Sequence, residues 1–443
     1  MSTRVGMVSL GCPKNQIDAE HMLFDLKTQG FQLVQDAALA DVVVINTCGF
    51  IESAKQEAID NILEFCTLKK EGRIKAVICT GCLAERYRDE VMKEIPELDA
   101  VIGIGSNAKL CHIIRDVLCD KKSVCDFEDK CKLPLDGGRI ISTEPFYAYL
   151  KIAEGCDNCC TYCAIPSIRG RFRSRRIEDV VEEAKWLAEH GVTEIVVVAQ
   201  DTTRYGEDLY GEPKLAQLLR ELCKIEGLKW IRTLYAYPER ITDELIATIR
   251  DEEKLVKYLD IPVQHCNGQV LKRMNRCGDR KALTELVNKL RAEIPGIVLR
   301  TTLIAGFPGE TEEQYGELLD FVKEMKFERL GCFAYSQEEG TPAAKMDGQL
   351  DEETKEHRAD VIMQEQMFIS DRLNEALVDR ELEVVVEGFD RYAECWFGRS
   401  AMDAPEIDGK VFFTCDEKPV IGQYITVHID DTLDYDLIGT RID

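Results

Sequence analysis

The sequence predicts an α/β protein with three parts: an N-terminal open parallel α/β domain, a central partial (β/α)6 TIM-like barrel and a small C-terminal OB-like antiparallel β-barrel. β-rich runs alternate with helical stretches over residues 4–135 and again from residue 147, which is the pattern of βαβ units on a parallel sheet. After residue 376, five short β-rich runs follow with turn signals between them, as in a small barrel. A chain of 443 residues is long enough for two or three domains.

The N-terminal domain is predicted to span residues 1–135, with strands at VGMVSLGC, VVVINTC, AVICTGC and AVIGIG. Cys12, Cys48 and Cys82 come just after the first three of these strands. The carboxyl ends of the strands in an open parallel sheet line one crevice, so we expect the three thiols to converge. A chain with 19 cysteines can also place three unrelated thiols at strand ends by chance, but the repeated order of strand, small residue and cysteine favours a three-cysteine site.

Cys79 forms a C-x-x-C pair with Cys82, so the third thiol of this site has two candidates. Cys79 lies inside the apolar run AVICTG, where a buried strand thiol is the ordinary interpretation. We therefore assign Cys82 to the site.

The segment at about residues 120–145 is rich in Cys, Lys, Asp and Gly and has little periodicity, and we place a linker at residues 136–146. The central domain, residues 147–376, then carries six strand candidates separated by helical stretches. One of these stretches, IEDVVEEAKWLAEHG, ends at Gly191, which is a suitable helix C-cap. The strand candidates are YAYLKIAEGC, TEIVVVAQD, KWIRTLYAYP, KYLDIPVQH, GIVLRTTLIAGFPG and ERLGCFAYS.

Cys156, Cys160 and Cys163 form a C-x-x-x-C-x-x-C triplet after the first central strand, at the end of a barrel strand where function is expected. Three thiolates can hold three irons of a 4Fe-4S cluster and leave the fourth iron open to bind another molecule. Cys159 lies inside the first gap of the triplet, which makes it the expected bystander. A structural zinc site would need a second cysteine pair nearby, and the neighbouring Cys131 is a lone thiol.

The C-terminal part begins with a predicted long helix over residues 351–376, followed by the barrel domain at residues 377–443. The five β-rich runs of the barrel are ELEVVVEGF, AECWFGRSA, KVFFTCD, QYITVHIDD and LIGTRI.

Composition and charge narrow the class of protein. The chain is 45% hydrophobic and 31% charged, and neither a secretory leader nor a membrane-spanning run is expected, so we predict a cytoplasmic protein. Nineteen cysteines in a chain of this size indicate reduced and partly metal-bound thiols rather than a disulfide scaffold. A net charge of −25 argues against nucleic acid as the main partner and favours a basic partner.

The triplet spacing resembles the radical S-adenosylmethionine (SAM) superfamily. SLGCPKNQIDAE, NTCGFIESA and GCLAERY around the strand-end cysteines, together with AIPSIRGRFRSR after the triplet, look like the methylthiotransferase family over nearly the whole chain. The C-terminal barrel resembles a TRAM domain. The resemblance implies two 4Fe-4S clusters, a SAM-cleaving one on Cys156, Cys160 and Cys163 and an auxiliary one on the strand-end cysteines that carries or delivers sulfur.

The family chemistry explains the need for two clusters. An unactivated C–H bond carries no acidic proton, so acid and base residues cannot open it at neutral pH, whereas a carbon radical can abstract the hydrogen atom. The resemblance implies that one SAM generates the radical and another methylates the sulfur. It also implies a sulfur donor and an electron donor of the reductase or flavodoxin type, with the protein positioning the cofactors against the substrate.

The substrate is predicted from the C-terminal barrel. Residues 378–443 hold 16 acidic and 6 basic side chains, a net charge of −10, whereas an RNA-binding barrel should be basic. This charge suits a basic ribosomal protein. The segment GRSAMDAPEIDG, residues 398–409, also resembles the branch of the family that modifies the β-carbon of an aspartate in ribosomal protein S12. The alternatives are a methylthiotransferase acting on an adenosine of transfer RNA and a non-catalytic iron-sulfur protein that binds the ribosome.

Weaker site candidates lie at other strand ends of the central domain. Gln200, Asp201 and Gly306 are candidates for SAM contacts. His265 is a candidate for substrate contact, with a structural histidine as the more frequent outcome. A run of arginines after the triplet is expected near SAM or a cluster, with an RNA patch or a solvated face as the alternatives. The arginines are Arg169, Arg171, Arg173, Arg175 and Arg176. Two thiols in the stretch that follows His265, Cys266 and Cys277, depart from the family pattern.

Overall fold

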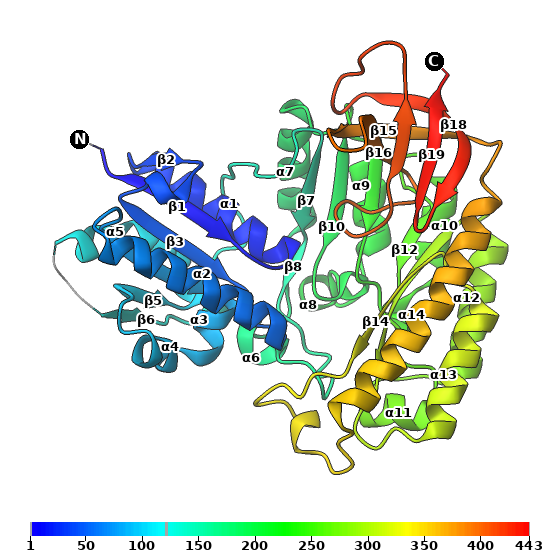
Figure 1. Cartoon of the computed structure of the whole chain (residues 1–443), viewed down its shortest axis with the longest axis horizontal. Coiled ribbons are helices and arrows are strands. Elements are labelled where there is room, and N and C mark those ends of the chain that lie inside the picture. Colours follow the sequence, from blue (N-terminus) through cyan, green and yellow to red (C-terminus); the bar gives the residue numbers. More distant parts are fainter. Residues whose placement is uncertain (1, 120–122, 443) are drawn as a thin grey trace. The chain divides into compact units, whose positions relative to one another are not determined.

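The computed structural model describes residues 2–119 and 123–442, and the chain divides into two compact units. The first unit comprises the N-terminal part up to Ser142 together with two later segments, Lys151–Arg175 and Glu338–Thr341. The second comprises Thr143–Leu150, Arg176–Gln337 and Pro342–Asp443. Figure 1 colours the chain from blue at the N-terminus to red at the C-terminus.

A parallel sheet of six strands forms the centre of the first unit, in the order β2-β1-β3-β4-β5-β6. The four strands expected from the sequence are confirmed as β1, β3, β4 and β5. The other two, β2 and β6, consist of QLV and VCD and lie in no apolar run, unlike the equally short β5, and β6 lies in the stretch expected to be irregular. The bounds are β1 (Arg4–Ser9), β2 (Gln32–Val34), β3 (Val42–Thr47), β4 (Ala76–Gly81), β5 (Ala100–Ile102) and β6 (Val124–Asp126).

Helices cover both faces of this sheet, which explains why its central strands are apolar at consecutive positions. The face that carries Val43 and Ile45 packs against α2 (Glu52–Lys70), and the face that carries Val42 and Val44 packs against α1 (Pro13–Thr28) and α5 (Leu110–Leu118). Two short helices, α3 (Cys82–Tyr87) and α4 (Asp89–Glu94), follow β4.

The later part of the first unit holds the cysteine triplet. β8 (Ala153–Glu154) pairs antiparallel with β9 (Arg173–Ser174), and the short helix α6 (Ile165–Arg169) lies between them. The triplet occupies the loop between β8 and α6.

The second unit contains the six predicted central strands, arranged in chain order as two sheets of three, β7-β10-β11 and β12-β13-β14. A parallel bridge between Ile231 and Leu255 and a hydrogen bond from the Ala236 amide to the Asp260 carbonyl (2.9 Å) join the two sheets. The strands are β7 (Tyr147–Lys151), β10 (Glu194–Val198), β11 (Trp230–Thr233), β12 (Tyr258–Asp260), β13 (Val298–Ala305) and β14 (Arg329–Ala334). The main helices between them are α7 (Ile177–Glu189), α9 (Leu215–Cys223), α10 (Asp243–Asp251), α12 (Arg280–Glu293) and α13 (Glu312–Met325).

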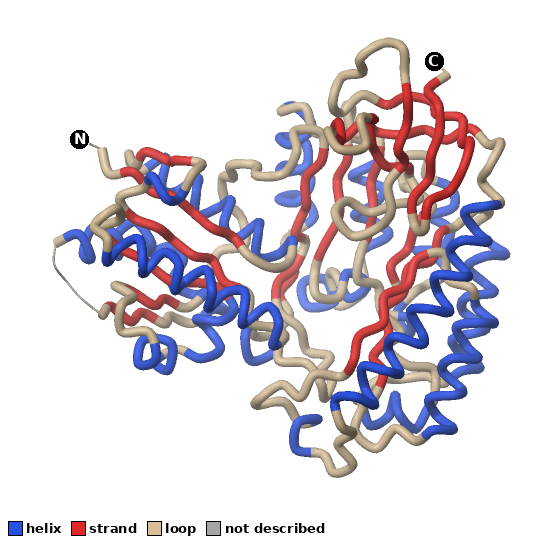
Figure 2. The backbone as a smooth tube through the Cα atoms, viewed as in Figure 1, coloured by secondary structure: helices blue, strands red, loops and turns tan. Residues whose placement is uncertain are grey.

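The C-terminal domain begins after α14 (Glu352–Glu375), which matches the predicted long helix. All five predicted runs form strands of a closed barrel in the order β15-β16-β17-β19-β18, drawn in red in Figure 2. The barrel core consists of inward valine, isoleucine and phenylalanine side chains such as Val384, Val411 and Phe413. The strands are β15 (Glu381–Asp390), β16 (Cys395–Ser400), β17 (Val411–Thr414), β18 (Tyr424–Leu433) and β19 (Asp436–Arg441).

Buried ion pairs attach the barrel to the central strands of the same unit. Glu194 at the start of β10 is fully buried and accepts hydrogen bonds from Arg232 (3.1 Å) and from Arg399 of the barrel. Asp403 accepts from Arg329 of β14 at 2.6 Å. Because buried charges are tolerated only when paired, these contacts fix the barrel on this surface.

Within the described ranges, no helix has the length and apolar character needed to span a membrane.

Candidate functional site

The three strand-end cysteines lie at the carboxyl ends of three adjacent strands. Cys12 is the N-cap of α1, three residues after β1 ends; Cys48 follows β3 directly; and Cys82 opens α3 directly after β4. Since β1, β3 and β4 are neighbours in the sheet, their ends bring the thiols together. The expected convergence is therefore present in the fold. Cys79, by contrast, lies within β4 and is fully buried in the hydrophobic core.

The thiols are close enough to interact electrostatically. Burial raises the pKa of Cys82 to about 12; the guanidinium of Arg169 lowers it, and the neighbouring Cys12 and Cys48 raise it. Burial likewise raises the pKa of Cys48, against the lowering effect of the Phe50 amide. Two buried thiols and one half-buried thiol with a cation beside them form an environment that favours thiolates once a metal replaces the proton.

Glycines permit the close approach of these loops. Gly11 has φ +91°, and a Cβ atom there would lie 2.7 Å from the Cβ of Cys48. Gly81 has φ +93°, and a Cβ there would lie 2.5 Å from the carbonyl oxygen of Thr47. Only glycine fits at such positions, so the glycines that precede Cys12 and Cys82 have a packing reason.

The cysteine triplet forms a second, compact thiol group. The Cys163 amide donates to the Cys160 carbonyl (3.0 Å), and the Cys156 amide donates to the Gly170 carbonyl (3.1 Å), which fixes both ends of the loop. Burial raises the pKa of Cys163 to about 12; the Ile165 amide lowers it, and Cys160 and Cys156 raise it further. The three thiols therefore sit close to one another.

The extra thiols named from the sequence occupy different environments. Cys159 is exposed, with φ +51°. Cys266 is fully buried, with its thiol 3.5 Å from the Glu317 carbonyl oxygen, and Cys277 is exposed.

Arg169 connects the two cysteine groups within the first unit. It is the last residue of α6, which follows the triplet, and its side chain is almost fully buried. Its Nη2 donates to Cys82 Sγ (3.3 Å) and to Asn15 Oδ1 (3.1 Å). Its Nη1 donates to the carboxylates of Asp18 and, at 3.3 Å, Glu154. A residue near one cysteine group therefore touches a sulfur of the other.

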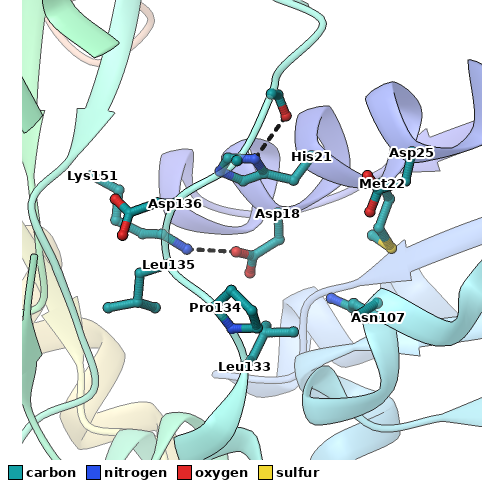
Figure 3. Close-up of a pocket in the computed structure, with 13 residues that line it drawn as sticks. Asp18, His21, Met22, Asp25, Asn107, Leu133, Pro134, Leu135, Asp136 and Lys151 are labelled. Carbon is teal, nitrogen blue, oxygen red and sulfur yellow. Dashed lines mark hydrogen bonds and ion pairs between the residues drawn. The ribbon is translucent and has the colours of Figure 1, made fainter. Parts of the chain in front are cut away.

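Lys151 completes a buried group of two positive and two negative side chains. Its Nζ donates to Asp18 Oδ1 (2.6 Å) and Glu154 Oε2 (2.8 Å), and Figure 3 shows the contact with Asp18 beside a pocket of about 170 Å³. Burial by itself would lower the pKa of Lys151, but the two carboxylates raise it above its ordinary value. The four charges balance, which offsets part of the cost of removing them from water.

A second set of contacts holds the loops around Cys48 and Cys82. Arg86 on α3 donates to the Gly49 carbonyl (2.9 Å) and to Glu338 (2.9 Å). Glu338 is buried and also pairs with Lys55 at 3.2 Å. The segment Glu338–Thr341 is thus tied to the strand-end cysteine loops, a contact that the sequence did not indicate because about 250 residues separate Arg86 from Glu338.

The arginine run is divided: Arg169, Arg173 and Arg175 make internal contacts, whereas Arg171 and Arg176 are exposed. Besides Arg169, Arg173 donates to the Leu133 and Lys130 carbonyls (both 3.0 Å), and Arg175 donates to Asp136 at 2.6 Å.

The candidate SAM contacts lie in the second unit. Gln200 and Asp201 follow β10, and Asp201 is fully buried, accepts a hydrogen bond from Thr203 (2.6 Å) and pairs with Arg240 at 3.6 Å. Gly306 follows β13 with φ +75°, and its amide donates to Glu310 at 3.0 Å. These contacts give Asp201 and Gly306 a structural role, and contact of all three positions with SAM remains a prediction.

His265 is fully buried, with Nε2 3.3 Å from Glu310 and Nδ1 accepting from the Asn267 amide at 2.9 Å. Burial by itself would raise the pKa of Glu310, but the contact with His265 is among those that lower it. Two non-glycine residues with positive φ lie at neighbouring strand ends, Tyr235 (+61°) after β11 and Gln264 (+68°) after β12. Backbone strain of this kind is concentrated at functional sites, and no sequence pattern predicts it.

Both cysteine groups fit iron-sulfur clusters by the chemistry of their donors. Soft thiolates are the ligands such clusters take, and each group supplies three of them. In the described part of the chain, no three His, Cys, Asp or Glu side chains are arranged to hold a single metal ion. In a four-iron cluster, each cysteine binds a different iron. The cysteine sulfurs of such a cluster therefore lie farther apart than the ligand atoms around a single metal ion.

Comparisons with known proteins agree with this arrangement. Residues 4–103 match the uncharacterized protein family UPF0004, residues 150–322 the radical SAM superfamily and residues 378–442 the TRAM domain. Two relatives are named ribosomal protein uS12 methylthiotransferase RimO. The one from Thermoanaerobacter sp. is 49% identical, over 98% of this chain and 99% of its own length. The one from Caldanaerobacter subterraneus subsp. tengcongensis is 51% identical over the same shares.

Solved structures show the fold of this chain at low sequence identity. The radical SAM methyltransferase TsrM from Kitasatospora setae, with cobalamin and a 4Fe-4S cluster bound, superimposes with a TM-score of 0.58 at 14% identity, over 77% of each chain. The cobalamin-dependent SAM radical enzyme OxsB superimposes with a TM-score of 0.53 at 16% identity, over 83% of this chain and 56% of OxsB.

Proposed function

Because the chain belongs to the ribosomal protein uS12 methylthiotransferase RimO family, we propose that it methylthiolates the β-carbon of an aspartate in ribosomal protein S12. The observation that carries the proposal is the presence of two three-cysteine groups in one compact unit, joined by Arg169. Inserting sulfur into a C–H bond needs both a radical source and a sulfur-bearing site.

Each cysteine group has its own role in the proposal. Cys156, Cys160 and Cys163 hold the cluster that binds SAM, and Cys12, Cys48 and Cys82 hold the auxiliary cluster. When bound, these groups supply one-electron chemistry and an iron-held sulfur, which the side chains of the protein cannot supply.

The side chains of the chain hold and shield the reacting groups. Cys48, Cys82, Cys156 and Cys160 are all buried, which keeps water away from the thiolates and protects reactive species. The ion pairs of Arg86 with Glu338 and of Arg169 with Asp18 fix the loops that carry the ligands. Gln200, Asp201 and Gly306, at barrel strand ends, are proposed to orient SAM.

The C-terminal barrel is proposed to attract the basic substrate. Asp403 forms a buried internal ion pair with Arg329, so the attraction of the basic substrate must come from other acidic side chains. Asp379, Glu381, Asp416 and Glu417 are exposed on the barrel, and their charges would steer a lysine- and arginine-rich protein.

The remaining partners follow from the reaction. A reductase or flavodoxin-type protein delivers electrons, and a separate sulfur donor resupplies sulfur. We place the enzyme in the cytoplasm because its proposed substrate is a ribosomal protein.

The test is intact-mass analysis of purified S12 and of transfer RNA after anaerobic incubation with reconstituted enzyme, SAM, sulfide and dithionite. A methylthio adduct on the S12 aspartate supports the proposal, and an adduct on RNA alone refutes the substrate. A Cys12→Ala variant should still release 5'-deoxyadenosine but form no adduct, whereas Cys160→Ala should do neither. A Cys277→Ala variant is the matched control, because this exposed thiol has no proposed role.

A further inference from the structure

We propose that Arg169 is a positioning residue for the auxiliary cluster, which holds the Cys82 sulfur by a hydrogen bond and raises the reduction potential of that cluster. The proposal rests on the proposed function in one respect, because it takes Cys82 as a cluster ligand.

The orientation of the Arg169 guanidinium is fixed on both sides. Asp18 and Glu154 accept from Nη1, while Asn15 and Cys82 Sγ accept from Nη2. The guanidinium is planar and always charged, so contacts at one nitrogen set the direction in which the other points. A lysine would keep the charge but could not make both sets of contacts.

The direction of the effect follows from the charge on the cluster. Adding one electron makes a cluster more negative, and both a hydrogen bond to a ligand sulfur and a nearby cation stabilise that state. Arg169 is only 2% exposed, so water screens its charge weakly. The carboxylates of Asp18 and Glu154 offset this charge, but they contact Nη1, whereas Nη2 is the nitrogen 3.3 Å from the sulfur.

The same contact gives Arg169 a place in both cysteine groups. It ends the helix that follows the triplet, and Glu154, which it contacts, lies two residues before Cys156. Arg169 therefore links the conformation of the triplet loop to the position of the Cys82 sulfur.

The experiment is a redox titration with dithionite and mediators, followed by electron paramagnetic resonance. The full-length background carries alanine at Cys156, Cys160 and Cys163, so that a cluster can form only at the strand-end site. We expect Arg169→Gln to shift the midpoint potential to more negative values and Arg169→Lys to shift it less. Arg173→Gln is the matched control, because Arg173 belongs to the same run and donates to backbone carbonyls.

An unchanged potential in Arg169→Gln, or an equal shift in Arg173→Gln, overturns the proposal. If Arg169→Gln does not hold iron, the double variant Asp18→Asn with Arg169→Gln restores the charge balance of the buried group. Its potential should still be lower than in the background, because it also lacks the hydrogen bond to sulfur, and an unchanged value there refutes the proposal. A background that binds no iron refutes the ligand assignment of the proposed function, which separates that failure from a failure of Arg169.

Discussion

Replacing Gly81 with alanine should disturb the strand-end cysteine site more than any other single methyl group added there. Gly81 has φ +93° and ψ −159°, a region essentially reserved for glycine that costs other residues about 1–3 kcal/mol. The new Cβ would also lie 2.5 Å from the Thr47 carbonyl oxygen and 2.6 Å from its nitrogen, both backbone atoms that cannot rotate away. Overpacking of this kind costs about 1–3 kcal/mol, so the free energy of unfolding should fall by roughly 2–6 kcal/mol in all.

The relief of this clash would push β4 and β3 apart at the ends that carry Cys82 and Cys48. We therefore expect Gly81→Ala to lose iron at the strand-end site as well as stability. The assay combines urea unfolding of the metal-free protein with iron and sulfide analysis after anaerobic reconstitution.

Gly72→Ala is the matched control, because Gly72 also has positive φ (+76°) but no atom lies within 4 Å of its Cβ position. This variant should lose about 1–2 kcal/mol at most and keep its iron. If the Gly81 and Gly72 variants unfold at the same urea concentration and hold equal iron, the argument from close strand packing is refuted.

Three further predictions concern charge and thiol chemistry. Burial raises the pKa of Cys79 to about 12, so at pH 8 its thiol should stay neutral and resist iodoacetamide. A peptide map should show the exposed Cys125 alkylated before Cys79, and equal labelling of the two would contradict the burial of Cys79. In thermal melts, Glu194→Gln should lower the free energy of unfolding by about 3–5 kcal/mol, because two buried arginines lose their carboxylate partner. Glu383→Gln is the control, because the exposed ion pair of Glu383 with Lys229 is worth about 0–1 kcal/mol. The Arg4 amide is the main cause that lowers the pKa of Asp41 to about 2. The stabilisation by Asp41 should therefore be present above pH 4 and disappear as the pH falls to 2. If the loss of unfolding free energy in an Asp41→Asn variant does not shrink over that range, this prediction is contradicted.

The cysteine positions and the main strands were predictable because they carry local patterns. A strand that ends in a small residue and a cysteine, repeated three times, predicts convergence once the sheet is known to be parallel. Strands β2 and β6 were missed because their residues, QLV and VCD, lie in no apolar run, whereas the equally short β5 lies in the run AVIGIG. They exist because neighbouring strands supply their hydrogen bonds.

The contacts around the site could not be predicted in the same way. Arg169 was one of five arginines with equal claims, and only the packing of α6 against α1 and α3 selects it as the partner of Cys82. Counting acidic residues in the barrel gave the sign of its charge but not its distribution. Asp403 and Asp408 face internal partners, Arg329 and Tyr258, and so contribute little to the outer surface.

The docking of residues 398–409 has a consequence for how the barrel can be inherited. The segment includes Arg399, Asp403 and Asp408, and their partners are dispersed over β10, β12 and β14. If the barrel alone were exchanged between relatives, Glu194 and Arg329 would remain in a buried interface without their matched partners. We expect these partner positions to change together among homologues, and a chimaera to become soluble only when both sides of the contact are transferred.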